Sequence, residues 1–238
     1  MRPSKRRMDD AERPLPPGGT ITGIVASPRS PGRFTVMIDG RSGPTLGLEA
    51  IERLRLAVGS STVGREATLA DEEDALRVYD RAVAMLAARG RATRDLERQL
   101  VRKGEPPELA RRAVERLRDQ GFLDDAAFAR SFVRSKSSGA GLARRRLEQE
   151  LGRKGVERAV VSEAIEDVFA EEEVDEREGA LALARKRNRS LGNADPQSRR
   201  RRLYAFLARR GYSPDVIAAA VSEVIRGDPG DFDDADAT

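Results

Sequence analysis

A nine-residue pattern that recurs three times constrains the fold of this chain more than any other feature. The copies are Leu96–Gly104, Leu147–Gly155 and Leu203–Gly211, and each has the form Leu-x-x-x-Leu-x-basic-basic-Gly. Leucines four residues apart lie on one face of a helix, and glycine readily adopts the left-handed conformation that often ends one. The basic pair suits the negative end of the helix dipole. The pattern therefore predicts one short amphipathic helix, used three times.

Each copy has one helical pattern before it and another after it. The preceding helices are expected at about residues 72–89, 125–136 and 173–188, and the following ones at Leu109–Leu117, Val161–Val168 and Val216–Val224. A single unit of three short helices buries little apolar surface, so neighbouring units must share their cores. The sequence therefore predicts an all-α fold, in which tandem repeats of three-helix units form an elongated array.

Local signals make finer predictions for the first unit. The apolar residues that share one face of its first helix are Leu76, Tyr79, Val83 and Leu86. Gly90 is expected to end that helix. Thr93 is expected to be the N-cap of the next helix, with Asp95 in its first turn.

The segment before the repeats has β-strand character. Thr20–Val25 and Phe34–Ile38 are two strand-like runs, and Asp39-Gly40 is typical of a tight turn. Leu46–Leu56 has the pattern of a short helix, so a small β-hairpin module is expected. The predicted domains are a disordered basic, Pro-rich arm (1–19), a small β-rich module (20–65), three-helix repeats (71–121, 122–171 and 172–226) and an acidic disordered tail (227–238).

Composition excludes most kinds of catalytic site. The 238 residues include no cysteine and no histidine, which removes disulfides, thiolate metal sites and Ser–His–Asp or Cys–His catalysis. Carboxylate and lysine chemistry remain open. No apolar run approaches the roughly 18 residues of a membrane span, and no apolar stretch follows the basic N-terminus as in a signal peptide. We expect a soluble, cytoplasmic, monomeric protein that is not an enzyme and needs no metal or cofactor.

The charge distribution points to a polyanionic partner. The net charge is only +4, but the last twelve residues contain five aspartates and no basic residue, so the rest of the chain carries +9. A basic body favours binding to a polyanion. The alternative is that the lysines and arginines only solvate helix surfaces, and composition alone favours neither explanation.

Basic residues gather at three positions of the repeat. The candidate interface residues are the pairs Arg102-Lys103, Arg153-Lys154 and Arg209-Arg210, the runs Arg144-Arg145-Arg146 and Arg199-Arg200-Arg201-Arg202, and Arg185, Lys186 and Arg187. The pairs can serve as helix C-caps, as a row of cations along a phosphate backbone, or as both. The runs open helices, where positive charge opposes the dipole, so they favour a phosphate or acidic-protein contact over mere solvation.

A small-residue segment precedes the first of these runs. Ser137–Gly141 is interpreted as a loop whose free N–H groups, together with the start of the next helix, could bind an anion. No Gly-Lys-Ser/Thr follows, so the segment is not a P-loop.

The most distinctive segment is Gly121–Val133, which reads Gly-Phe-Leu-Asp-Asp-Ala-Ala-Phe-Ala-Arg-Ser-Phe-Val. Asp124 and Asp125 could suggest a metal site, but their place before a helix favours an N-cap followed by a first-turn acid. Phe128 and Phe132 lie four residues apart and are expected to pack on the core.

This segment and the three repeats resemble the RecX family of RecA regulators. The resemblance covers about residues 20–226, including the β-type leader found in some members. The residues taken as structural members of the family motif are Gly121, Phe122, Asp124, Asp125, Phe128 and Phe132. The third unit lacks the Asp-Asp signature, and the acidic tail is not a family motif.

The resemblance implies a non-enzymatic protein that acts in the SOS response and homologous recombination. Its partners would be the RecA recombinase, as monomer and as filament, and single-stranded DNA, with double-stranded DNA a further candidate. It would lie in the groove of the RecA–single-stranded DNA filament and inhibit the ATPase, recombinase and coprotease activities of RecA. The alternative is an independent helical DNA-binding protein with no recombinase partner.

Overall fold

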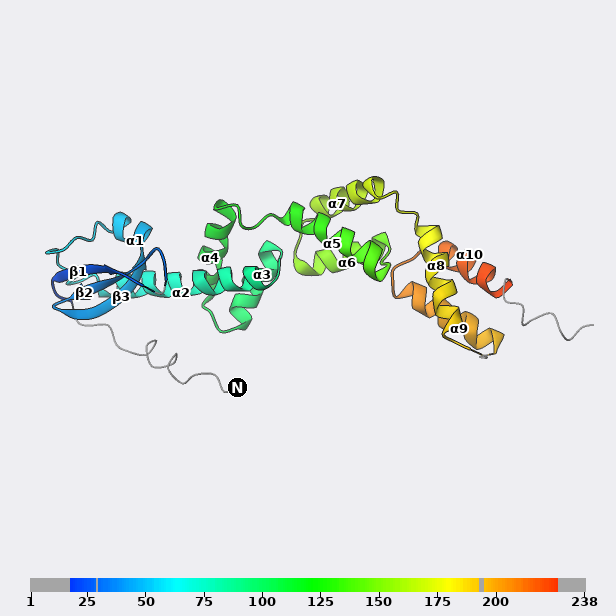
Figure 1. Ribbon diagram of the computed structural model, residues 1–238, viewed down its shortest axis with the longest axis horizontal. Helices are drawn as coiled ribbons and strands as arrows, with labels where there is room; N and C mark the ends of the chain where they lie inside the picture. Colours follow the sequence, from blue (N-terminus) through cyan, green and yellow to red (C-terminus); the bar gives the residue numbers. More distant parts are fainter. Residues whose placement is uncertain (1–17, 29, 193–194, 227–238) are drawn as a thin grey trace, which may run out of the picture. The chain divides into compact units, whose positions relative to one another are not determined.

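The computed structural model describes residues 18–28, 30–192 and 195–226 (Figure 1). They form a small sheet followed by helices, and the chain divides into two compact units. One unit is Met1–Arg89 with Glu97–Asp119, and the other is Gly90–Leu96 with Gln120–Thr238. The predicted arm and tail lie largely (1–17) or wholly (227–238) outside the described residues.

The N-terminal module is a three-stranded sheet rather than the expected hairpin. Antiparallel strands β1 (Ile21–Ala26), β2 (Arg33–Ile38) and β3 (Arg41–Gly47) lie in that order, and α1 (Leu48–Arg53) follows. The prediction missed β3 and placed Leu46 in a helix, whereas Leu46 pairs with Phe34 in the sheet. The reason is that residues 41–45, Arg-Ser-Gly-Pro-Thr, lack alternating apolar side chains, so only pairing with β2 identifies them as a strand.

Helix α2 (Glu66–Ala88) serves both the sheet and the first repeat. Leu69 belongs to the core beneath the sheet, and the Thr45 amide donates to the Glu73 carboxylate at 2.8 Å. Farther along, Val78, Ala82 and Met85 are the buried residues on the part of α2 that belongs to the repeat. A helix with two successive partners changes its buried face along its length, and for that reason a single predicted stripe fails.

The predicted face of α2 is therefore only partly correct. Leu76 is buried, but the side chain of Val83 is 39% exposed. The helix ends at Ala88, and Arg89 follows in an extended conformation, so the prediction that Gly90 ends the helix is wrong. Helices α3 (Thr93–Arg102) and α4 (Pro107–Asp119) complete the first repeat, and α4 packs against α2.

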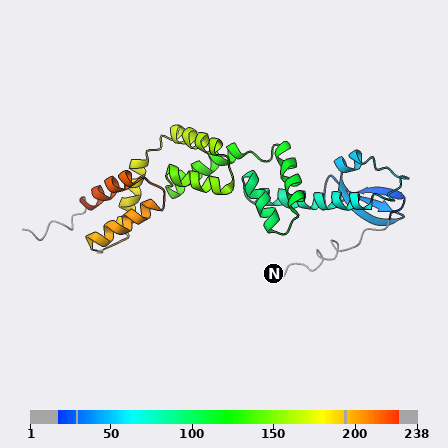
Figure 2. The same cartoon turned by 180° about the vertical axis from the view of Figure 1, so that it is seen from behind.

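The second compact unit holds the other two repeats (Figure 2). Helices α5 (Asp125–Ala140), α6 (Arg144–Lys154) and α7 (Arg158–Glu171) surround one apolar core, to which Phe132, Leu147 and Ile165 belong. Helices α8 (Glu176–Arg189), α9 (Pro196–Ala208) and α10 (Pro214–Arg226) surround another, formed around Leu203, Leu207 and Val221. The Leu pairs of the repeated motif lie in these cores, as predicted.

The observed architecture confirms a mostly helical fold of tandem three-helix units with a small β-rich part at its N-terminus. The expected domain boundaries stay predictions. Helix α2 begins at Glu66, between the predicted β-rich module (20–65) and the first predicted repeat (71–121). None of the described helices is long and apolar enough to cross a membrane.

Candidate functional site

The middle helix of one repeat begins inside the core of the next repeat. Ala143, the N-cap of α6, is 2% exposed and belongs to the core built by α8, α9 and α10. Ala92, just before α3, is fully buried in the core of the second repeat. The two alanines occupy the same position of the repeat, 51 residues apart. Adjacent repeats are therefore joined through the start of the middle helix.

A carboxylate from the following repeat caps each of these helix starts. Asp125 accepts hydrogen bonds from the Thr93 amide at 2.8 Å and from the Thr93 hydroxyl at 3.1 Å. Glu176 accepts from the Arg144 amide at 2.8 Å. The prediction that Thr93 is the N-cap is wrong, because Thr93 is already the first residue of α3 and the capping group comes from 32 residues away.

The third unit has no Asp-Asp pair, as the sequence indicates, but a different acidic pair takes the same two positions. Asp124 caps α5 by accepting from the amides of Ala126 and Ala127, which confirms its predicted role. Asp175 caps α8 in the same way, and Glu176 follows it as Asp125 follows Asp124. The third unit therefore has an Asp-Glu pair with the chemistry of the Asp-Asp pair.

The glycine of the repeated motif lies at the same junctions. A Cβ atom on Gly155 would come within 2.6 Å of the Arg94 Cβ, and one on Gly211 within 2.6 Å of the Arg146 amide nitrogen. Gly104, in the first copy, has open space around it. All three have φ near +90°, so each suits a helix end, but only the second and third also permit close contact between repeats.

The predicted anion-binding loop before α6 does not exist. Ser137–Ala140 belong to α5, and Gly141 is the left-handed residue that ends this helix. The segment is thus a helix C-terminus, whose dipole disfavours anions. The Arg144 amide is already bound by Glu176, so it is not available to a ligand. Serine and glycine suggested a loop, but continuation of the helix satisfies their backbone groups.

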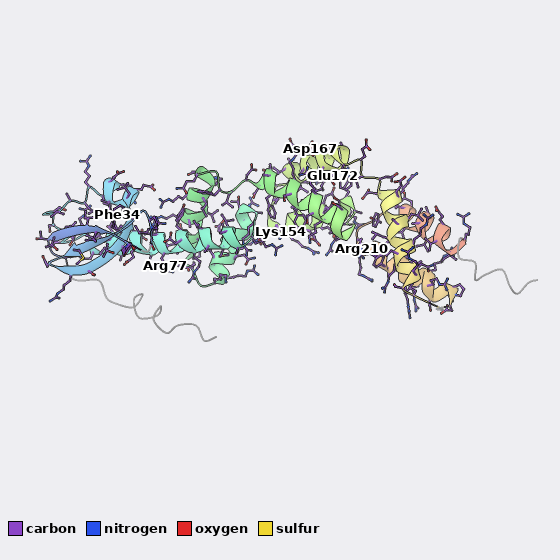
Figure 3. The ribbon with its side chains drawn as sticks, viewed as in Figure 1. Phe34, Arg77, Lys154, Asp167, Glu172 and Arg210 are labelled. Carbon is purple, nitrogen blue, oxygen red and sulfur yellow. The ribbon has the colours of Figure 1, made fainter. Side chains whose placement is uncertain are left out.

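Four of the candidate cations lie against aromatic rings, and one of them is Arg187, 5.7 Å from the Phe206 ring centre. The Arg144 guanidinium lies 5.1 Å from the Phe169 ring centre, and Lys154 Nζ lies 5.7 Å from that of Phe132. The Arg210 guanidinium lies 3.8 Å from the Phe206 ring centre. Figure 3 labels Lys154 and Arg210. Cations over aromatic faces stabilise the local packing, so these four have a structural role in addition to any contact with a partner.

Arg210 is held most firmly. Its Nε donates to the Ala140 carbonyl at 3.1 Å, and its own carbonyl accepts from the Ala143 amide at 2.9 Å. Burial lowers the pKa of its guanidinium, and the neighbouring charges of Arg209 and Arg187 act in the same direction. Since an arginine stays protonated even so, Arg210 is a partly buried positive charge at the junction of the second and third repeats.

Other candidate cations form ion pairs. Arg146 binds Glu150 at 3.0 Å, and Arg185 binds Glu223 at 2.8 Å. Several exposed candidates form no salt bridge within the described part of the chain; they are Lys103, Arg145, Lys186, Arg200, Arg201, Arg202 and Arg209. These are the cations that the fold leaves most available to a partner.

Two arginines of α5, Arg130 and Arg134, form salt bridges with carboxylates instead. Arg134 binds Glu171 of α7 and Glu172, the C-cap of α7, each at 2.9 Å, and Arg130 pairs with Asp167 and Glu171. Figure 3 labels Asp167 on α7 and Glu172 at its end. Among the candidate cations of the described second unit, exposed residues without a salt bridge include Arg145 on α6, Lys186 on α8, Arg200, Arg201 and Arg202 on α9, and Arg209 just after α9.

A cavity of about 420 Å³ brings some of these cations together, between α6 on one side and α9 and α10 on the other. Its lining residues are Arg145, Arg146, Gln149, Tyr204, Ala208, Arg209, Gly211, Tyr212, Pro214 and Ile217. Three predicted site residues, Arg145, Arg146 and Arg209, converge here, and no carboxylate lines the cavity. We call this the junction cleft.

Two tyrosines in the junction cleft were not predicted as site residues. Tyr212 is 6% exposed, and burial raises the pKa of its hydroxyl to about 12, with Glu176 adding to the shift. Tyr204 is 43% exposed. The sequence contained a signal for Tyr204, because a tyrosine stands where the other two copies of the motif have Glu97 and Glu148.

The remaining motif residues divide into two groups. Phe132 is buried and Phe128 packs against the same core, as predicted, while Gly121 has the positive φ of a helix-ending glycine. Phe122 was expected to be structural, but its side chain is 66% exposed, because the chain turns at Gly121 and only Leu123 enters the core.

Within the described residues, no cluster of three or more Asp or Glu side chains could hold a metal ion.

Fold and site together define a class of protein built from tandem three-helix modules. Capping carboxylates join the modules, and arginines lie on their outer faces. Residues 124–165 match the model of the second three-helix domain of RecX, and residues 175–221 match that of the third. Regulatory protein RecX of Amycolatopsis mediterranei (strain U-32) is 37% identical over 160 residues, covering 67% of this chain and 90% of the relative. The chain belongs to the RecX family.

Further relatives agree. Regulatory protein RecX of Mycolicibacterium smegmatis is 36% identical over 155 residues, which cover 63% of this chain and 79% of the relative. A crystal structure of regulatory protein RecX has a TM-score of 0.70 at 24% identity, covering 85% of this chain and 98% of that one. RecX from Lactobacillus salivarius gives a TM-score of 0.51 at 18% identity, over 64% and 97%. The two structures support the fold.

Proposed function

We propose that this protein is a non-enzymatic regulator of the RecA recombinase. It binds RecA and lies in the groove of the RecA–single-stranded DNA filament, where it inhibits ATP hydrolysis, strand exchange and coprotease activity. It acts in the cytoplasm as a monomer. The observation that carries the proposal is the set of exposed arginines Arg145, Arg200, Arg201 and Arg202 on α6 and α9, none of which forms a salt bridge within the part of the chain that the structure describes.

Electrostatics supports a polyanionic partner. Arg145, Arg200 and Arg202 are exposed, and none forms a salt bridge within the described residues. Leaving like charges unpaired on adjacent surfaces destabilises a folded protein slightly, and a bound polyanion would remove that cost. A RecA filament assembled on DNA presents phosphates as well as protein surface, so it suits such a site.

The direct test is the rate of DNA-dependent ATP hydrolysis by RecA, with and without this protein. We expect substoichiometric protein to lower the rate on single-stranded DNA, and the protein alone to hydrolyse no nucleotide. An unchanged rate at saturating protein would refute the proposal.

Independent DNA binding is the second candidate function, because the same exposed arginines could bind DNA without a recombinase. Co-sedimentation with RecA in the absence of DNA distinguishes the two. A regulator should pellet with RecA alone, whereas an independent DNA-binding protein should need DNA.

A further inference from the structure

We infer that the junction cleft is a binding site for single-stranded nucleic acid, in which one base stacks on Tyr204 and the flanking phosphates contact Arg145 and Arg209. The inference rests on the proposed function, because it takes the single-stranded DNA of the RecA filament as the part that this cleft contacts. The inference goes beyond the proposed function by assigning the nucleotide contact to one cleft and to named residues within it.

The charge of the cleft favours phosphate. Arg145, Arg146 and Arg209 line it, and Arg146 alone is paired, with Glu150. A second cavity of similar volume, about 420 Å³, lies along α6 and α7, but Glu148 lines it and only Arg158 is basic there. Because no carboxylate lines it, the junction cleft suits an anion better than this second cavity does.

The ring of Tyr204 provides a stacking surface. It is 43% exposed in a chain with no tryptophan and few aromatic residues, and it lies on the cleft wall. Ala208, one turn later on α9, also lines the cleft, and its small side chain leaves space beside the ring. Single-strand binding sites combine such exposed rings with a basic groove, because every base has a face that can stack.

The cleft is continuous with the arginine run of α9. Arg200, Tyr204 and Ala208 are four residues apart along this helix, and Arg201 lies on the same face. Arg200 and Arg201 are exposed. From Arg200 to Arg209 the helix rises roughly 13 Å. The run therefore leads directly to the cleft, and a strand that places one base on Tyr204 can place its next phosphates on these arginines.

A single strand fits this site better than a duplex or an acidic protein segment. In a duplex the base faces are stacked within the helix and cannot reach a side chain in a cleft. An acidic segment would use the arginines but would have no need of the exposed ring. Gln149 on the α6 wall adds an amide that can donate to and accept from a base edge.

Substitution of Tyr204 tests stacking in the full-length protein. The probe is a short fluorescein-labelled oligothymidylate, titrated at low salt without RecA. We expect Tyr204→Ala to weaken binding roughly 5- to 100-fold, and Tyr204→Phe to bind like the parent protein because it keeps the ring. The protein has only three tyrosines, so its intrinsic emission gives a second signal. Binding should quench the parent emission, and Tyr204→Phe should lose most of that quenching without losing affinity.

A matched pair of arginine variants tests the phosphate contact. Arg145→Gln and Arg118→Gln remove the same charge, but Arg118 lies on α4 in the other compact unit and is 62% exposed beside Asp119. We expect Arg145→Gln to weaken oligonucleotide binding and to flatten the log–log salt dependence by roughly 0.7. Arg118→Gln should leave that slope unchanged. Circular dichroism of each variant verifies that helicity is retained.

The outcomes separate this inference from the proposed function. If Tyr204→Ala binds the oligonucleotide as well as the parent, or if the parent does not bind it, the nucleotide site is refuted even when RecA is inhibited. If inhibition of RecA depends on Tyr204 and Arg145 while the oligonucleotide does not bind, the cleft takes a protein segment and the inference is equally refuted. Ring-dependent oligonucleotide binding by a protein that leaves the RecA ATPase unchanged supports the cleft and refutes the proposed function.

Discussion

Asp124 and Asp125 are adjacent carboxylates that bind the starts of two different helices. Asp124 accepts from amides two and three residues ahead and begins its own helix, α5. Asp125 reaches back to Thr93 and begins α3 of the preceding repeat. One residue thus stabilises a helix within the repeat and the other joins two repeats. Neither role requires a metal ion, which explains the acidic pair without a catalytic site.

Replacement of Asp124 should therefore change stability through hydrogen bonding rather than through charge. We expect Asp124→Ala to lower the free energy of unfolding by about 0.5–2 kcal/mol, and Asp124→Asn or Asp124→Ser to restore most of the loss, because both side chains cap helices well. Denaturant titration followed by circular dichroism measures this. Failure of Asn and Ser to restore stability would mean that the carboxylate acts by charge.

At the scale of the element, the repeated motif combines a helix end with a joint between repeats. The two leucines enter a core, the last basic residue of the second and third copies lies on an aromatic ring, and the glycine turns the chain against the preceding repeat. The first copy ends at Gly104 with open space around it. The same nine residues therefore support different contacts in different copies.

Glycine substitutions separate these two roles. Gly104→Ala is the matched control, because its φ of +92° is that of Gly211 but no atom lies within 4 Å of the added Cβ. We expect it to cost about 1 kcal/mol of unfolding free energy through backbone strain alone. Gly211→Ala should cost about 1–3 kcal/mol more, because the added Cβ meets the Arg146 backbone and the joint must open.

Thermal or denaturant unfolding of both variants gives the comparison. Equal destabilisation by Gly104→Ala and Gly211→Ala would show that the close approach between the second and third repeats contributes nothing.

At the scale of the whole molecule, the sign and placement of charge govern association with a polyanion. The chain carries a net +4, and its last twelve residues contain five aspartates and no basic residue. The positive residues that the fold leaves without ion pairs include several on α6 and α9. Long-range attraction depends on the summed charge, so the acidic end of the sequence should weaken it at low salt.

Removal of residues 227–238 raises the net charge to +9 and should tighten binding to single-stranded DNA at low salt. The gain should shrink as salt rises, because the Debye length falls to about 10 Å at 0.1 M. A full-length variant with the five aspartates changed to asparagine is the matched control and should reproduce the gain. Unchanged or weaker binding by both proteins at low salt would contradict the prediction.

The sequence by itself determined the features that depend on near neighbours. The Leu spacing, the helix-ending glycines, the Asp124 cap and the inward Phe132 all follow from residues a few positions apart, and all are present in the structure. The recurrence of the motif then determined the tandem plan, because identical short helices that cannot fold alone must pack on one another. Of the site, the sequence indicated the arginines but not their arrangement.

Only the tertiary structure decided which groups meet across long separations. β3 has no apolar alternation and exists because β2 pairs with it, and the caps of α3 and α6 come from 32 residues away. The fold also divided the arginines, holding Arg210 over a ring while leaving Arg145 exposed beside Tyr204. Such contacts depend on how helices pack, and packing depends on the shapes of side chains remote in sequence. No local pattern contains that information.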